Sequence, residues 1–112
     1  MIRKKHQPDY LDKVKTFMES NYRNALNVQQ LAILAGVSLR TLQSTFHSFY
    51  GVTMQVFHLE LRINKAKDLL TDTNKSIKEI ASHVGYHDSS TFDHFFRHVT
   101  GINPEQYRKE NT

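Results

Sequence analysis

The chain has 112 residues and a mass of 13.1 kDa, enough for one compact domain or for two very small subdomains that share a connecting element. It has no cysteine, which excludes disulfides and cysteine-bound zinc, and no apolar stretch long enough for a transmembrane helix, so we expect no membrane partner. The net charge of +4 favours polyanionic partners without identifying one.

The chain begins with a basic segment that lacks the apolar stretch of a signal peptide. We therefore expect residues 1–7 to form a tail or linker and the protein to be cytoplasmic. Pro8, followed by Leu11, Val14 and Met18 at helical spacing, predicts a first helix over about 8–22.

The rest of the chain nearly repeats itself, at an offset of 49 positions that becomes 50 after one residue is added near Tyr86-His87. Matching positions are Leu31 and Ile80, Ala32 and Ala81, Gly36 and Gly85, Leu42 and Phe92, Phe46 and Phe96, Gly51 and Gly101, Val52 and Ile102, and Phe57 and Tyr107. Two copies of one supersecondary unit are therefore predicted.

Capping residues at equivalent places predict two helices in each copy. Asn27 with Gln30, and Ser76 with Glu79, begin short helices over about 28–35 and 77–84 that end near a glycine. Ser38 and Asp88 then begin helices over about 39–50 and 89–100, which stop at Gly51 and Gly101. Each copy therefore reads as a helix-turn-helix.

Two further helix starts follow the copies. Thr53 begins a connecting helix over about 54–71, which would span roughly 27 Å at 1.5 Å per residue. Asn103-Pro104 begins the last helix. Helix signals are dense and strand signals nearly missing, so the fold is predicted to be all-α.

The second helix of each copy has an apolar and a polar face. The expected inward residues are Leu42, Phe46 and Phe49 in the first copy, and Phe92, Phe95, Phe96 and Val99 in the second. The expected outward residues are Arg40, Gln43, Ser44 and His47, and Ser90, Asp93, His94 and Arg97. An ordinary solvent-exposed helix face has the same pattern. However, arginine can pair with guanine and glutamine with adenine, and the repetition of the face favours a function in base recognition.

From Leu31 to Arg108 the chain resembles the DNA-binding domain of AraC/XylS transcription regulators. The second copy carries the specific motifs, which are Ser76-Ile77-Lys78-Glu79-Ile80-Ala81, Val84-Gly85-Tyr86, Ser90-Thr91-Phe92, Phe95-Phe96-Arg97, Gly101-Ile102-Asn103-Pro104 and Tyr107-Arg108. Arg62-Ile63, Ala66 and Leu69-Leu70 match the family's connector.

The resemblance implies about seven helices at 8–110, with a first helix-turn-helix subdomain at 8–52, a linker helix at 53–72 and a second subdomain at 73–110. It also implies two recognition helices in adjacent major grooves of double-stranded DNA, about 34 Å apart. The implied base-contacting residues are Arg40, Gln43, Ser44, Ser90, Thr91 and His94. The implied backbone-contacting residues are Ser38, Thr41, His47, Lys78, Ser89 and Arg97.

Family members often have arginine where Ser44 stands, and Asp93 either accepts from a cytosine or repels phosphate. We therefore expect the first copy to supply most of the sequence discrimination. The family further implies activation through RNA polymerase. An effector ligand and a dimerisation domain are not expected in this chain, which is either an excised domain or a short regulator of the effector-less type.

Two other classes of function compete with a regulator. A helical protein-interaction module would bind acidic protein surfaces through the outward faces. A metal-dependent enzyme could use the pairs His83/His87 and His94/His98, but no His-Glu-x-x-His pattern accompanies them. We therefore predict no catalytic residue, no metal and no cofactor.

Overall fold

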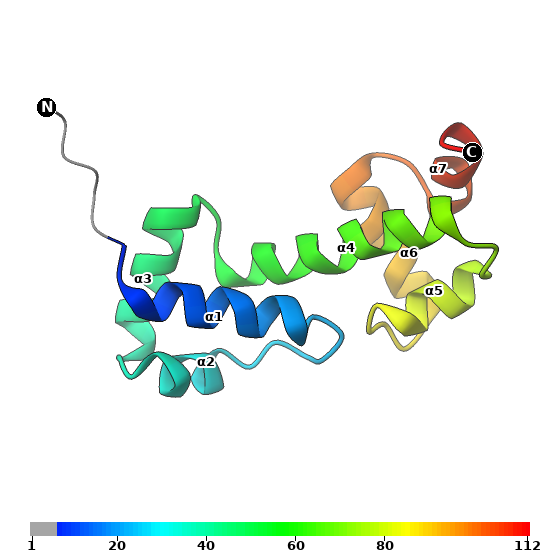
Figure 1. Ribbon diagram of the computed structural model, residues 1–112. Helices are drawn as coiled ribbons and strands as arrows, with labels where there is room; N and C mark the ends of the chain where they lie inside the picture. The colour runs from blue at the N-terminus through cyan, green and yellow to red at the C-terminus, as the bar shows by residue number, and fades with distance from the viewer. Residues whose placement is uncertain (1–6) are drawn as a thin grey trace, which may run out of the picture. The chain divides into compact units, whose positions relative to one another are not determined.

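The computed structural model describes residues 7–112 and contains, within that range, seven helices and no strand (Figure 1). The helices are α1 (Asp9–Ser20), α2 (Val28–Ala35), α3 (Leu39–Tyr50), α4 (Met54–Asp72), α5 (Ile77–His83), α6 (Ser89–Thr100) and α7 (Pro104–Glu110). The predicted all-α class is confirmed. The basic segment predicted as a tail lies, up to residue 6, outside the described residues.

The predicted caps form the helix ends. The Asn27 side chain accepts the backbone N–H of Gln30 at 3.1 Å, and Ser76 and Glu79 make a reciprocal capping box with both distances at 3.1 Å. Gly51 and Gly101 end α3 and α6 with φ of 76° and 86°. These left-handed conformations favour glycine, so each recognition-type helix stops where the sequence predicts.

The chain packs as two compact units. Among the described residues, the first contains 7–21 together with Leu26–Phe57, and thus α1, α2, α3 and the start of α4. Its α1 packs on α2, and α2 on α3 (Figure 1). The buried apolar side chains of this unit are Leu11, Val14, Met18, Leu31, Ala32, Leu42, Phe46 and Met54.

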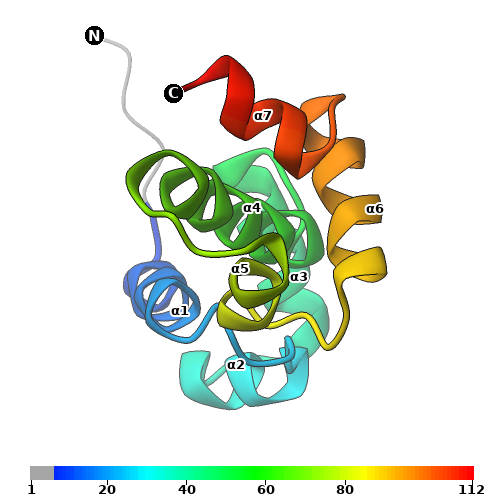
Figure 2. The ribbon, with the colours of Figure 1, turned by 90° about the vertical axis from the view of Figure 1, so that its right-hand side faces the viewer.

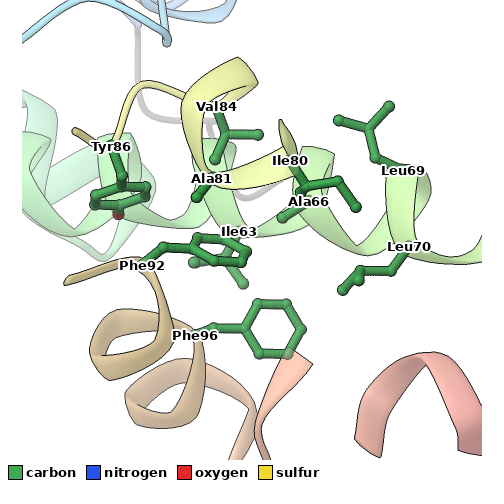
Figure 3. Close-up of a cluster of buried hydrophobic side chains, with 10 residues drawn as sticks. All are labelled: Ile63, Ala66, Leu69, Leu70, Ile80, Ala81, Val84, Tyr86, Phe92 and Phe96. Atoms are coloured by element: carbon green, nitrogen blue, oxygen red, sulfur yellow. The ribbon is translucent and has the colours of Figure 1, made fainter. Parts of the chain in front are cut away.

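The second unit contains the strap Tyr22–Ala25 and residues His58–Thr112. In Figure 2, α5, α6 and α7 lie around the C-terminal part of α4. Figure 3 shows the core between them, where α4, α5, the following turn and α6 each contribute. Its buried members are Ile63, Ala66, Leu69, Leu70, Ile80, Ala81, Val84, Tyr86, Phe92 and Phe96.

The division falls inside α4, after Phe57. Ile63, Ala66 and Leu70 on the later part of this helix are fully buried in the core of the second unit. The connecting helix is thus a structural member of that core in addition to being a connector. The predicted boundaries at residues 52 and 72 stay predictions.

The repeat extends to aromatic geometry. The rings of Phe46 and Phe57 lie 5.5 Å apart at 75°, and those of Phe96 and Tyr107 lie 5.5 Å apart at 79°. Edge-to-face packing at this distance stabilises each pair beyond the burial of its surface. The two copies therefore hold matching aromatic residues in matching geometry.

The expectation that Val99 faces inward is wrong. Its side chain is 37% exposed, whereas Phe92 and Phe96 are fully buried. Val99 lies in the last turn of α6, and it is not among the residues that pack against the core, whose contacts with α6 centre on Phe92 and Phe96. Phe49 and Phe95, also expected inward, are half-buried.

Candidate nucleic-acid interface

The polar face of α3 is free of the core. Arg40, Gln43, Ser44 and His47 are all exposed, while Leu42 and Phe46 on the opposite face are fully buried. The predicted outward set is therefore confirmed as exposed. No acidic residue occurs in α3, and among residues 7–112 Arg40 has no ion-pair partner. This face presents amide, hydroxyl, imidazole and guanidinium groups with no opposing charge on its own helix.

The N-terminus of α3 is fixed by Ser38 and Thr41. The Ser38 hydroxyl accepts the Thr41 backbone N–H at 3.1 Å and donates to the Thr41 hydroxyl at 3.0 Å. Both hydroxyls therefore have a structural role besides any contact with phosphate. The remaining backbone N–H groups of this first helical turn point out of the helix end, where they can bind an anion.

The outward face of α6 has a different electrostatic character. Ser90, Thr91, His94 and Arg97 are exposed, and Ser89 and Asp93 are half-buried. The Asp93 carboxylate accepts a charge-assisted bond from Nε of Arg97 at 2.9 Å. Thus Arg97, a predicted phosphate contact, is paired with Asp93, which occupies the position that matches Gln43 in the repeat.

This pair was not predicted from the sequence, although a spacing of four residues on a helix was a usable signal. The side chains of Arg97 and Asp93 are 58% and 38% exposed, so the bond is solvated and weak, on the order of 0.5 kcal/mol. It can exchange for a phosphate contact, but in the free protein it neutralises the cation that α6 offers.

The N-cap of α6 adds a second carboxylate at this face. Asp88 accepts the Thr91 backbone N–H at 2.7 Å, and this bond lowers the pKa of the Asp88 carboxyl. Lys78, the remaining predicted backbone contact, is exposed on α5. The predicted residues of the second copy therefore lie among more acidic groups than those of the first.

Two arginines of the sequence motif hold loops within the second unit. Arg62 donates from Nε to the Tyr22 carbonyl at 2.8 Å and from Nη2 to the carbonyls of Arg23 and Asn24, at 3.2 and 3.0 Å. Its guanidinium also lies 5.0 Å from the centre of the Tyr86 ring. The strap is thus fixed to α4 and to the turn that precedes α6.

Arg108 has the corresponding role at the other loop. It donates to the carbonyl oxygens of Leu70 at 3.0 Å and of Lys75 at 2.7 Å. These contacts join α7 to the segment between α4 and α5. The sequence marked both arginines as part of a pattern but gave them no role, because a backbone carbonyl partner leaves no trace in residue type.

The histidine pairs of the sequence were the alternative candidates for metal ligands. Within residues 7–112, no three His, Cys, Asp or Glu side chains come together as potential metal ligands. Burial lowers the pKa of His83, and the neighbouring charges of Arg23, Lys65 and Lys75 lower it further. In the same range, every helix is too short or too polar to cross a bilayer.

Two capped helix pairs, each with a tight turn and an exposed polar second helix, define a helix-turn-helix protein of the DNA-binding class. A family model described as a helix-turn-helix domain matches residues 31–110. The chain is 32% identical over 105 residues to the melibiose operon regulatory protein of Escherichia coli (strain K12), covering 94% of this chain and 35% of that protein. It is 31% identical over 107 residues to the transcriptional activator NphR of Rhodococcus sp, covering 95% of this chain and 32% of that protein.

Solved structures agree with these sequence matches. An AraC-type transcriptional regulator from Chromobacterium violaceum superposes with a TM-score of 0.84 at 31% identity, covering 92% of each chain. The DNA-binding domain of AdpA, solved in complex with a target DNA, also has a TM-score of 0.84, at 26% identity, covering 91% of this chain and 92% of that one.

The chain belongs to the AraC/XylS family of transcription regulators and has the fold of its DNA-binding domain. It spans about a third of the length of the curated relatives it matches. The predicted family is therefore confirmed for this domain.

Proposed function

We propose that the protein binds double-stranded DNA in a sequence-specific manner through α3 and α6, each in one major groove of the same duplex, one helical turn apart. The observation that carries the proposal is the polar face of α3, which is exposed, free of acidic residues and stabilised from behind by Leu42 and Phe46. An exposed arginine beside a glutamine on such a helix fits the edges of guanine and adenine.

The two helices have different roles in this proposal. Arg40, Gln43 and Ser44 contact bases from α3, and Ser90, Thr91 and His94 make fewer discriminating contacts from α6. Backbone contacts come from Ser38, Thr41, His47, Lys78, Ser89 and Arg97. Among residues 7–112 Arg40 has no ion-pair partner, whereas Arg97 is paired with Asp93. This difference supports base reading by α3 and positioning by α6.

In the cell, we propose that the protein regulates transcription from the cytoplasm as an activator, not as an enzyme. Two relatives are named as a transcriptional activator and an operon regulatory protein, which supports this direction. RNA polymerase is the partner that activation requires.

Selection of bound duplexes from a random-sequence pool tests the proposal. We expect one site to be enriched, with its strongest preferences in one half and a footprint that covers two successive major grooves. Binding that never rises above the affinity for random duplex would contradict sequence-specific recognition. A footprint limited to a single groove would contradict the use of both helices.

A further inference from the structure

The outer surface of α2 is apolar and carries no charge. Ile33 is 81% exposed and Leu34 is 38% exposed. No acidic or basic residue occurs anywhere in α2. Exposure of one aliphatic side chain is ordinary, but two adjacent ones on an uncharged helix form a surface that water solvates poorly.

Beside Leu34 the surface is hollowed. A groove of about 540 Å³ lies between α1 and α2, which are neighbours in the first unit (Figure 1). Phe17 and Leu34 provide its apolar lining, and Asp12 and Lys13 lie at the same groove. The surface therefore combines a projecting side chain, Ile33, with a groove that can accept an apolar side chain.

The second copy provides an internal control for this surface. At the offset of 49 positions, Ile33 corresponds to Ser82 and Leu34 to His83. Ser82 is exposed on α5, and the second copy folds with the same helix-turn-helix arrangement. Leu34 lies against α1 at the groove, but Ile33 is almost fully exposed, so the fold does not require an apolar residue at its position.

We propose that this α1–α2 surface pairs with the same surface of a second copy of the chain. In a twofold interface each contact occurs twice, so a surface must be complementary to itself. The α1–α2 surface meets this requirement, because Ile33 of each copy can enter the groove of the other copy. Uncharged α2 helices meet without repulsion, and neighbouring Asp12 and Lys13 can pair with Lys13 and Asp12 of the other copy.

The size of the surface sets the strength of the association. A stable interface buries about 800 Å² per partner, and a patch built around Ile33, Leu34 and one groove is smaller. We therefore expect a weak dimer that forms at high protein concentration or when DNA brings two copies together. None of the residues assigned to DNA contact is used, so this inference stands or falls independently of the proposed function.

Sedimentation equilibrium of the whole chain is the first test. We expect the apparent mass to rise with concentration, and Ile33→Ser, which copies the residue of the second repeat, to raise the dimer dissociation constant by about tenfold or more. Because Ile33 is exposed, the variant should keep the thermal transition of the unmodified chain. A chain that stays monomeric at every concentration, or a variant that associates equally well, overturns the proposal.

Disulfide trapping is the second test, and the absence of native cysteine makes it clean. Ile33→Cys should form a covalent dimer under mild oxidation at least about tenfold faster than the matched control Ser82→Cys, because association raises the effective thiol concentration. Equal trapping rates would contradict the proposal that a second copy binds this groove, and would indicate a different protein as its partner.

Discussion

The two helix-turn-helix copies differ on the surfaces that do not pack. Inside, they are matched, with capped helix starts, left-handed glycines after α3 and α6, and the same edge-to-face aromatic pair. Outside, Arg40 of α3 has no ion-pair partner in the described part of the chain, while Arg97 of α6 is paired with Asp93. Packing constrains the inward residues of both copies alike, so the two copies differ mainly in their outward residues.

The turns of the two copies also differ, and this gives the largest expected effect. Gly85 has φ of 104°, and a Cβ added there would collide with the Arg23 carbonyl oxygen and lie 2.8 Å from Nη2 of Arg62. Gly36 has φ of 72° and no atom within 4 Å of the same position. Gly85→Ala should therefore lower the free energy of unfolding by about 3 kcal/mol or more, against about 1 kcal/mol for Gly36→Ala.

Urea denaturation of both variants, followed by circular dichroism, measures this difference. Equal losses would mean that the strap held by Arg62 moves aside easily, and that the close contact of strap and turn has little importance for stability.

The assignment of base reading to the first copy predicts the next effect. Arg40→Ala should weaken binding to the selected site by about 1–3 kcal/mol and leave binding to random duplex almost unchanged. Arg97→Ala, at a paired cation of α6, should weaken both by a similar smaller amount. Fluorescence anisotropy with the two duplexes distinguishes them. Loss of specific and random binding in equal measure on Arg40→Ala would assign that residue to phosphate.

The ion pair of α6 predicts a gain of affinity. Asp93→Asn removes a carboxylate from the face and releases Arg97, so binding to every duplex should tighten by about 1 kcal/mol at low salt. In an Arg97→Ala background the gain should shrink, because no cation is left to release. A loss of affinity confined to one site would instead show that Asp93 accepts a hydrogen bond from a cytosine.

The smallest expected effect is a pH dependence of stability, which should arise in the second unit, where His58 lies. Burial lowers the pKa of His58, and Arg62 lowers it further, while the Nε2 of His58 lies 2.9 Å from the Asn24 carbonyl. Because the folded pKa is below the ordinary 6.5, the unfolded chain takes up the proton first as pH falls. Stability from this residue is complete above about pH 6.5 and decreases below it.

Since His58 is half-exposed, the loss should be less than about 1 kcal/mol. It should appear in the second unit and diminish in His58→Gln when unfolding is compared between mildly alkaline and mildly acidic buffer. An unchanged pH dependence in that variant would assign the effect to another group, such as His83.

The sequence was sufficient for the features that depend on local chemistry. Asn27, Ser38, Ser76 and Asp88 marked helix starts because a cap is a contact within three residues. Apolar spacing placed Phe92 and Phe96 in the core. The same spacing failed at Val99, because periodicity identifies a face but not how far along the helix that face is covered.

Long-range contacts were not accessible in this way. The carbonyl partners of Arg62 lie about forty positions away and are backbone atoms, so no residue type signals them. The Asp93–Arg97 pair could be predicted from its spacing. Whether the Arg97 side chain contacts Asp93 or extends into solvent depends on solvation, which the spacing does not give. The exposure of the polar faces of α3 and α6 was predictable, whereas the difference in charge between the two faces was only partly predictable.

A base-by-base substitution scan of the selected duplex tests the central claim most directly. We expect changes in the half-site contacted by α3 to cost about 1–3 kcal/mol of binding free energy each, and changes in the half-site contacted by α6 to cost clearly less. Costs that are equal in the two half-sites, or larger in the half-site contacted by α6, would contradict a division of labour between a reading helix and a positioning helix.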